Sequence, residues 1–342
     1  MSTRAYSNIS NVSPPVYCEK KVLERAGPHV CLDVACDSKN VPKNSGAAVN
    51  FRRWVNPAVN DTPNPEGTTP ASRALTHLDY NTTVDRFAEV FEESRYNYDL
   101  DPWDSVKGAA DVLGDLIVRT RERIRWNAAR SGSNILYNSP AIGGRGSVNG
   151  AMTLGRLEVM IRSIEASKGQ TFTELQKAST AVSTHGVEPS YLLFGHTDLM
   201  PDFRRMPGFR TLPEMSGMSA GFKNGCLRGS VNNMLVFLSP ELEPYYGEGA
   251  AVGSTGMKSR DGTNVDVYPV VVVAQHALGS IRLRGEGANG YGAVRVDILD
   301  KADKSDPTNN RIKIASAWYD AALVLAEEWM YRGEFGATDE PT

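Results

Sequence analysis

The feature that most constrains this chain is a long polar segment, residues 38–98, that offers no core of its own. Proline, asparagine, threonine and glycine dominate it. Alternating residues predict strands at 48–55 and 77–84, and the tip between them, 56–71, has turn chemistry. A loop this long is uncommon inside a compact domain and usually has a function when it is ordered. We expect it to contact another copy of the chain rather than to enclose a catalytic pocket.

A single long helix is predicted after this segment, at 102–131. Asp101 occupies the N-cap position, Pro102 the first helical position, and Gly132 the C-cap position. At 1.5 Å per residue such a helix is about 45 Å long. Before it, a strand is expected at 82–91 with Val84, Phe87 and Val90 buried.

The rest of the chain predicts a mixed α+β structure. A second amphipathic helix is expected at 154–168, and a short helical turn at 202–206. Short apolar strands are expected at 191–194, 234–238, 267–274 and 293–299. The stretch 311–334 stays open, because its alanines favour helix whereas its alternating pattern favours strand.

Composition limits the classes of function. The 342 residues are 41% hydrophobic and 23% charged, with a net charge of −3, so no overall basic charge indicates nucleic-acid binding. We expect no signal peptide and no membrane span, because no apolar run reaches 18 residues. Four cysteines, Cys18, Cys31, Cys36 and Cys226, fit unpaired thiols in a reducing compartment.

One motif suggests a serine hydrolase. Residues 217–221 match GxSxG around Ser219, and Asp266 and His276 follow in the order found in α/β-hydrolases. That motif needs a strand before the serine and a helix after it, and neither is predicted here. A flexible surface loop is the favoured interpretation.

The other motifs of enzymes and metal sites are equally incomplete. GxGxxG at 285–290 should open a helix that binds a dinucleotide, but a strand pattern follows it. His29, Cys31 and Cys36 lack paired zinc-site spacing, and the aspartates between 297 and 306 lack calcium-loop spacing. We therefore expect no catalytic residues, no cofactor and no metal site.

Arginines crowd the end of the long helix. They are Arg119, Arg121, Arg123, Arg125 and Arg130, opposed only by Glu122. Cations near a helix C-terminus can complement the helix dipole and stay solvated. The alternative is an inward basic face that meets acidic neighbours or phosphate, and both interpretations stay open.

A family resemblance rests on short motifs that occur in one order along most of the chain. They are VPKNSG at 41–46, FRRW at 51–54, EGTTP at 66–70, NILY at 134–137, YLLFGH at 191–196, MPGF at 206–209, DVYP at 266–269, SDPTN at 305–309 and EWMYR at 328–332. In this order the sequence resembles the major capsid proteins of tailed bacteriophages with the Hong Kong 97 (Johnson) fold, in a podophage branch.

The resemblance implies a domain organisation. It comprises an N-terminal arm at 1–37, an extended loop at 38–85, a peripheral domain at 86–180 and 300–336 with the spine helix at 102–131, and an axial domain at 181–299. It favours strands in the ambiguous C-terminal stretch. It also implies a structural protein that assembles into hexamers and pentamers of an icosahedral head around double-stranded DNA, located in the virion and, during assembly, in the bacterial cytoplasm.

Partners and contacts follow from the same resemblance. We expect self-association, a scaffold, a portal, possible decoration proteins, and non-specific contact with packaged DNA. Phe51, Arg52, Arg53 and Trp54 are the candidate contacts between subunits, because aromatic residues and arginine are enriched in interface hot spots. Trp54 could instead brace its own hairpin. An encapsulin-like nanocompartment shell shares the implied fold and is the alternative function. No intersubunit crosslink is expected.

Overall fold

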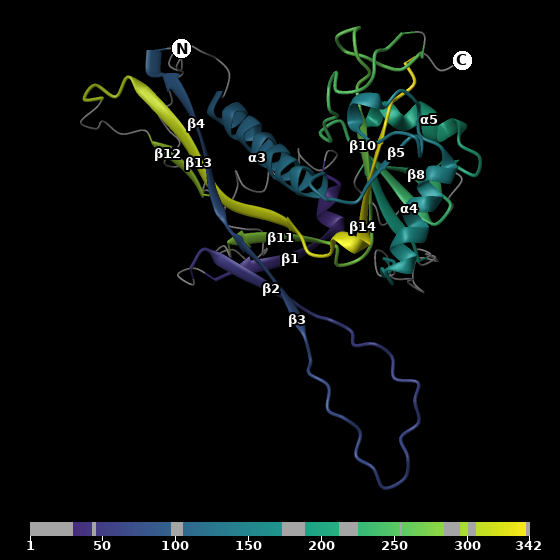
Figure 1. Cartoon of the computed structure of the whole chain (residues 1–342). Helices are drawn as coiled ribbons and strands as arrows, with labels where there is room; N and C mark the ends of the chain where they lie inside the picture. Colours follow the sequence, from purple (N-terminus) through teal and green to yellow (C-terminus); the bar gives the residue numbers. More distant parts are fainter. Residues whose placement is uncertain are drawn as a thin grey trace, which may run out of the picture.

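The structure, a computed structural model, describes residues 30–42, 46–96, 105–172, 189–211, 225–253, 255–283, 295–299 and 306–339. Its strands form two large sheets and one hairpin, which are arranged as two bodies with the hairpin projecting from them (Figure 1). The long helix α3 (Ser105–Ala129) lies along one body and ends against the other.

The first body is built on a five-stranded sheet. Its strands are β1 (Cys36–Val41), β11 (Leu278–Leu283), β13 (Arg311–Val324), β12 (Arg295–Leu299) and β4 (Asp85–Ser94). The central strand β13 pairs antiparallel with β4 from Arg311 to Asp320. Because alternate side chains of a strand point to opposite faces, β13 buries one face, and α3 packs against it through Leu113 and Ile117.

The second body is built on a seven-stranded sheet that is covered on both faces. Its strands are β5 (Ile135–Tyr137), β14 (Met330–Phe335), β10 (Tyr268–Val273), β6 (Tyr191–Gly195), β9 (Met234–Leu238), β8 (Leu227–Val231) and β7 (Arg210–Thr211). One face carries the helix α4 (Leu154–Ala166), and α5 (Met200–Arg205) packs there with Phe203. The other face is covered by the end of α3, through Trp126, and by the N-terminal segment, through Leu32.

Burial on both faces explains the uninterrupted apolar sequence of the inner strands. Every residue of β6, β9 and β10 is buried. Along β6, Tyr191 and Leu193 join the core beneath α4, whereas Leu192 and Phe194 join the core beneath α3. Strands buried on both faces are typically continuous hydrophobic runs rather than alternating ones.

Most predicted elements are confirmed within a few residues. The hairpin strands are β2 (Ala48–Trp54) and β3 (His77–Thr83), and the C-terminal stretch forms strands rather than a helix. The segment 311–324 forms a strand because a strand buries Ile312, Ile314 and Trp318 beneath α3. This burial outweighs the preference of alanine for a helix, which amounts to only a small free energy per residue.

Two local predictions are wrong. Val90 is 57% exposed, because on β4 only Phe87 and Phe91 turn toward the core beneath α3. Gly132 is not a left-handed cap; a Cβ there would lie 2.6 Å from the Met330 Cε atom, so the end of that side chain would have to move. The expected cap and start of the helix, Asp101 and Pro102, lie outside the described residues.

The strands of each sheet come from separate parts of the chain. Strands β11 and β12 pair with β13 in the five-stranded sheet. Strand β14 pairs with β10 in the seven-stranded sheet. Chain segments therefore cross between the bodies more than once.

The core beneath α4 gives a test of the fold. Replacing the fully buried Leu157 with alanine should lower the free energy of unfolding by about 2–5 kcal/mol, because a cavity remains after the side chain is removed. Replacing Glu158, the exposed neighbour on the same helix, should change it by less than about 0.5 kcal/mol. Equal losses in urea unfolding of the two variants would contradict the orientation of α4.

Candidate functional site

The projecting hairpin is the first candidate site. Every residue from Trp54 to Asp79 is exposed, and the loop that joins β2 to β3 extends far from both bodies (Figure 1). Within the described structure, the hydrogen bonds of residues 55–76 all remain in the loop, for example from the Arg73 guanidinium to the Ala58 carbonyl. The loop therefore buries nothing on its own chain.

The root of the hairpin, by contrast, is anchored to its own chain. The Arg53 guanidinium stacks 4.3 Å from the ring centre of Trp329 and forms an ion pair with Glu328. Both partners lie at η6 (Glu327–Trp329), the turn that leads into β14. Phe51 packs near Val41 and Val49, and the Lys39 ammonium lies 4.8 Å from its ring centre.

Two cross-strand pairs stiffen the hairpin itself. The Arg52 guanidinium donates two hydrogen bonds of 2.8 Å to the Asp79 carboxylate on β3. Opposite Trp54 in the register lies His77, and the two rings meet edge to face with centroids 5.4 Å apart. Trp54 nevertheless stays 53% exposed. All four expected contact residues have partners on their own chain, but Trp54 also keeps a large exposed apolar surface.

The arginines of α3 form the second candidate site, and they divide into two groups. Arg121 and Arg125 are buried, because they continue the i+4 spaced stripe of Leu113 and Ile117 beneath the helix. Arg119 points the other way and, like Arg123, is exposed.

The buried arginines belong to a network of opposite charges. An Arg121 nitrogen lies 3.2 Å from an Asp320 oxygen of β13, and an Arg125 nitrogen lies 3.1 Å from an Asp33 oxygen. Arg282 of β11 also pairs with Asp33. Glu122 accepts backbone hydrogen bonds of 2.9 Å from Cys31 and Leu32. This network ties the N-terminal segment, α3, β11 and β13 together.

Burial dominates the electrostatics of this network. Loss of water raises the pKa of the Glu122 and Asp320 carboxyls and lowers the pKa of Arg121 to about 10. Neighbouring groups of opposite charge oppose each of these shifts. The arrangement can hold elements together, but its positive and negative groups pair with one another.

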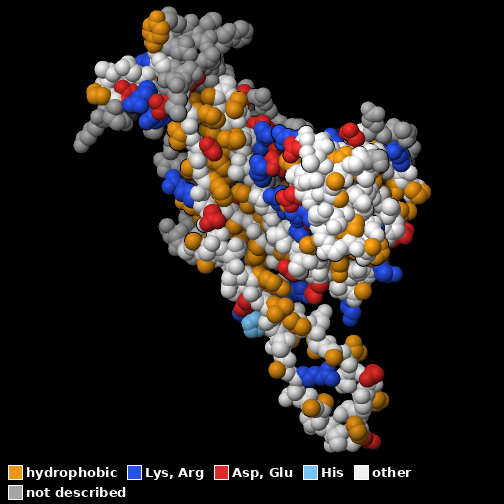
Figure 2. Space-filling view, turned by 45° about the horizontal axis from the view of Figure 1, so that its top comes forward, with side chains coloured by type: hydrophobic (Ala, Val, Ile, Leu, Met, Phe, Trp, Pro, Cys, Tyr) orange, Lys and Arg blue, Asp and Glu red, His pale blue; other side chains and the backbone are white. Residues whose placement is uncertain are grey.

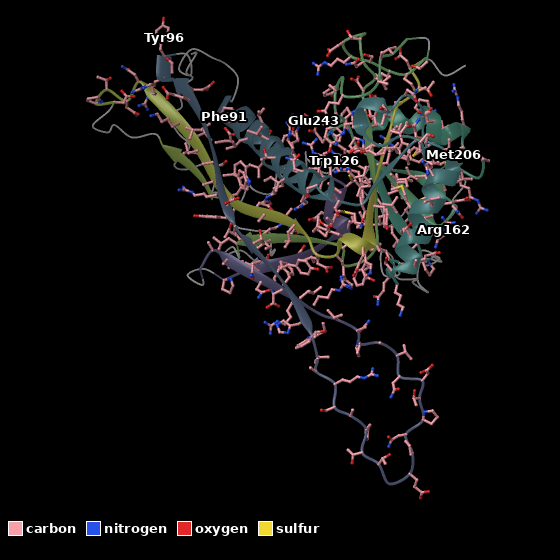
Figure 3. All side chains as sticks on the ribbon, in the orientation of Figure 1. Phe91, Tyr96, Trp126, Arg162, Met206 and Glu243 are labelled. Atoms are coloured by element: carbon pink, nitrogen blue, oxygen red, sulfur yellow. The ribbon has the colours of Figure 1, made fainter. Side chains whose placement is uncertain are left out.

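The exposed arginines contact the second body. Arg119 and Arg123 form ion pairs with Glu241 and Glu243, and the Trp126 indole donates to the Glu243 carbonyl at 3.1 Å (Figure 3). Figure 2 shows blue and red side chains alternating along this boundary. Arg121 and Arg125 are therefore unavailable to an inward basic face. For Arg119, Arg123 and Arg130 such a face stays a prediction.

The residues of the proposed hydrolase are not assembled among the described residues. Ser219 lies outside them. The Asp266 carboxylate accepts 2.8 Å hydrogen bonds from the backbone N–H groups of Gly247 and Arg260. The His276 Nδ1 atom instead lies 2.7 Å from the Asp37 carboxylate. The two groups needed to activate a serine thus have other partners. The expected dinucleotide motif, 285–290, also lies outside the described residues.

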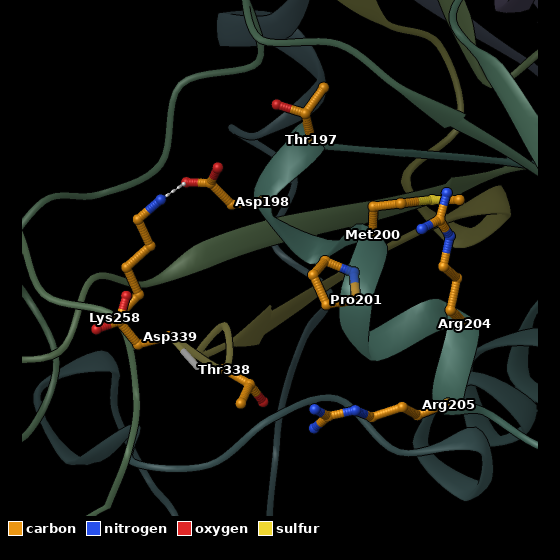
Figure 4. A pocket seen from close by; sticks show the side chains of 9 residues that line it. All are labelled: Thr197, Asp198, Met200, Pro201, Arg204, Arg205, Lys258, Thr338 and Asp339. Atoms are coloured by element: carbon orange, nitrogen blue, oxygen red, sulfur yellow. Dashed lines mark hydrogen bonds and ion pairs between the residues drawn. The ribbon is translucent and has the colours of Figure 1, made fainter. Parts of the chain in front are cut away.

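One cavity, of about 620 Å³, opens beside α5 (Figure 4). The Asp198 carboxylate in its wall accepts hydrogen bonds of 2.8 Å from Lys258 and Tyr268. Arg204 and Arg205 extend from α5 along the cavity (Figure 4). In the described part of the chain, no three His, Cys, Asp or Glu side chains are placed to hold a metal ion. Within the same ranges no helix has the length and hydropathy of a membrane span.

The long helix along a sheet, the second body with a sheet covered on both faces, and the projecting hairpin together define the Hong Kong 97 type of capsid fold. The chain is similar to a subunit in the capsid of Ralstonia phage GP4, with a TM-score of 0.63 and 13% identity, over 94% of this chain and 92% of that one.

Two further solved structures extend the comparison. A subunit of the cyanophage Pam1 capsid has a TM-score of 0.55 and 13% identity over 99% of this chain and 96% of that one. The SrpI encapsulin of Synechococcus elongatus PCC 7942 has a TM-score of 0.52 and 9% identity over 100% and 94%. No protein-family model and no curated protein matches the sequence. The likeness establishes the fold.

Sequence reasoning missed the residues that hold the N-terminal segment. Asp33, Arg282 and Asp320 carried no motif. For Asp320 the sequence did contain an indication. Every second residue of β13 is buried, beginning with Ile312, Ile314, Ser316 and Trp318, and Asp320 is the next in this series. A charge in a buried register requires a partner of opposite charge.

The buried network predicts different costs for two arginines on one helix. Arg125→Met should lower the free energy of unfolding by about 3–5 kcal/mol, because it leaves the buried Glu122 carboxylate without its cation. Arg123→Met, two residues away, should cost less than about 1 kcal/mol, because its ion pair is exposed. Denaturant unfolding measures both, and an equal cost would contradict the burial of Arg125.

The hairpin pair predicts a pH dependence. Hydrogen bonding from Arg52 lowers the pKa of Asp79 to about 2. Because the folded pKa lies below the ordinary value of about 3.9, the pair contributes above pH 4 and is lost as the pH falls through about 2. A carboxyl NMR titration of Asp79 should show this low midpoint. In Arg52→Gln the midpoint should return toward 4, and an unchanged midpoint would exclude Arg52 as the cause.

Proposed function

We propose that this chain is the major capsid protein of a tailed bacteriophage of the podophage type. It assembles into hexamers and pentamers of an icosahedral head that encloses double-stranded DNA. The observation that carries the proposal is the hairpin that projects, fully exposed from Trp54 to Asp79, from a fold shared almost end to end with phage capsid subunits. The hydrogen bonds of residues 55–76 stay within the loop, so neither body of the same chain holds the loop in place.

The mechanism is assembly through the projecting loop. One subunit lays its loop on the next, so donor and acceptor surfaces differ, and such heterologous contacts close into rings. Ordering the loop costs conformational entropy that only the surface buried on the neighbour can offset. Trp54 is the favoured anchor, because an exposed aromatic ring braced by His77 is preorganised for contact.

The resemblance supplies the remaining parts of the proposal. Residues 1–37 serve as the N-terminal arm, 38–85 as the extended loop, 86–180 with 300–336 as the peripheral domain, and 181–299 as the axial domain. A scaffold, a portal and decoration proteins are the proposed partners. Packaged DNA is contacted without sequence specificity, in keeping with a net charge of −3.

A nanocompartment shell is the second candidate, because the SrpI encapsulin has a similar fold. The contents of purified particles distinguish the two functions. A phage head contains double-stranded DNA after infection of the host, whereas a nanocompartment encloses an enzyme. The podophage motifs, such as FRRW at 51–54 and YLLFGH at 191–196, favour the phage head.

Removal of the loop tests the proposal. Residues 56–75 can be replaced by Asn-Gly, which joins Val55 to Thr76, the residues next to the pair of Trp54 and His77, through a tight turn. The variant should retain its thermal unfolding midpoint, because the loop contacts neither body, yet form no shells or capsomer rings in negative-stain electron microscopy and sedimentation. Normal shells from this variant would overturn the role of the loop.

Three variants locate the contact within the hairpin. Trp54→Ala should reduce shell formation while leaving the folded subunit intact, and the double change with Arg53→Ala should abolish it. Val59→Ala, at an exposed apolar position in the loop, serves as the control of similar chemistry and should assemble more efficiently than Trp54→Ala. Unaltered assembly of the double variant would confine Trp54 to bracing its own hairpin.

A further inference from the structure

Buried polar atoms that lack hydrogen-bond partners gather in one layer, between the end of α3 and the five-stranded sheet. Within the described residues, eleven nitrogen and oxygen atoms of this layer are shielded from solvent and form no hydrogen bond. Six are nitrogen donors, two are hydroxyl oxygens and three are carboxylate oxygens. They belong to eight side chains, which are Arg121, Glu122 and Arg125 of α3, Ser280 and Arg282 of β11, and Ser316, Trp318 and Asp320 of β13.

The strand register brings the polar side chains of the sheet to one face. Ser316, Trp318 and Asp320 are alternate residues of β13, so they point to the same side of the sheet, beneath α3. Asp320 lies opposite Arg282 in the register of β11, and Ser280 is two residues before Arg282. These side chains therefore form one layer rather than isolated polar positions in the core.

The ion pairs of the layer are close, but they leave these atoms without hydrogen bonds. Arg121 Nε lies 3.2 Å from Asp320 Oδ2, and neither atom forms a hydrogen bond. An Arg125 nitrogen lies 3.1 Å from an Asp33 oxygen with the same result. The Ala321 N–H lies close enough to lower the pKa of Asp320, yet it is not aligned for a hydrogen bond. Because an unsatisfied buried polar group lowers stability, native proteins almost always supply it with a partner.

Water fits the chemistry of the layer better than an ion does. The oxygen of a water molecule accepts from nitrogen donors and its hydrogens serve carboxylates, so one molecule can bridge an arginine and an aspartate. An added ion would leave a net buried charge, which is costly. The charges are already balanced, because three arginines of the layer face the carboxylates of Asp33, Glu122 and Asp320.

We propose that the layer between α3 and the five-stranded sheet binds a set of ordered water molecules. They accept hydrogen bonds from Arg121, Arg125 and the Trp318 indole, and they donate hydrogen bonds to Glu122 and Asp320. Each of them takes about three partners, as buried waters in proteins usually do. The layer is then satisfied although its charged groups do not bond to one another directly.

Bridging waters give this joint a property that direct bonds lack. When α3 shifts against β13, a water molecule can exchange one acceptor for another, so no charged group loses its partner. If the proposed function holds, on which this consequence alone rests, the joint lets α3 adjust to the different angles between neighbours in rings of five and six subunits.

A structure of the full-length chain at a resolution that shows ordered water tests the proposal. The sample is the assembled particle or the isolated subunit, because the layer lies within one chain. Density should lie about 2.7–3.2 Å from Trp318 Nε1 and from an oxygen of Asp320. The Trp126 indole is the internal control, because it donates directly to the Glu243 carbonyl at 3.1 Å and should have no water at its nitrogen.

A single substitution tests the indole as a ligand of the water. Trp318→Phe removes one donor from the layer, so the density beside residue 318 should be lost while the density at Asp320 remains. Direct hydrogen bonds that satisfy the eight side chains of the wild type, with no density between them, would overturn the proposal. Because the test needs no assembly, its failure is distinct from an absence of shells.

Discussion

The structure depends on one buried set of charges at the end of α3. Arg121, Glu122 and Arg125 are the points at which the helix holds β13, the N-terminal segment and Asp33. Charged groups that are removed from water lower stability unless each has a partner of opposite charge. Here Arg121, Arg125 and Arg282 face the carboxylates of Asp33, Glu122 and Asp320. Such a network provides less net stability than an apolar core of the same size, but it accepts only one arrangement of its elements.

That selectivity matters because the two bodies meet in one core, in which Trp126 of α3 and Leu278 of β11 pack with strands of the seven-stranded sheet. The seven-stranded sheet is covered by α4 on one face, while the other face depends on Trp126 and the N-terminal segment. The exposed pairs of Arg119 and Arg123 with Glu241 and Glu243 lie along the same boundary. Exposed pairs are weak, so they adjust the contact between the bodies rather than define it.

Sequence patterns were sufficient where local physics decides the structure. Strands β2, β3, β6 and β9 were predicted within one residue, because turn residues and apolar runs mark their ends. The burial of Arg121 and Arg125 was not predicted, because it depends on partners such as Asp320 that lie almost 200 positions away. The same holds for Arg53, whose partners Glu328 and Trp329 are fixed only by the fold. No local pattern records such distant pairs.

The stack of Arg53 on Trp329 holds the root of the hairpin, so a small rotation at the root produces a large displacement at the tip. From Trp54 to the tip near Glu66 the chain runs about 12 residues, or roughly 40 Å when extended. A rotation of about 5° at the root then displaces the tip by about 3–4 Å over that length. The angle at which the loop leaves the root is set by the turn into β14. In the proposed assembly, small adjustments of that turn would change the angle between neighbouring subunits, and this angle determines the radius of a closed shell.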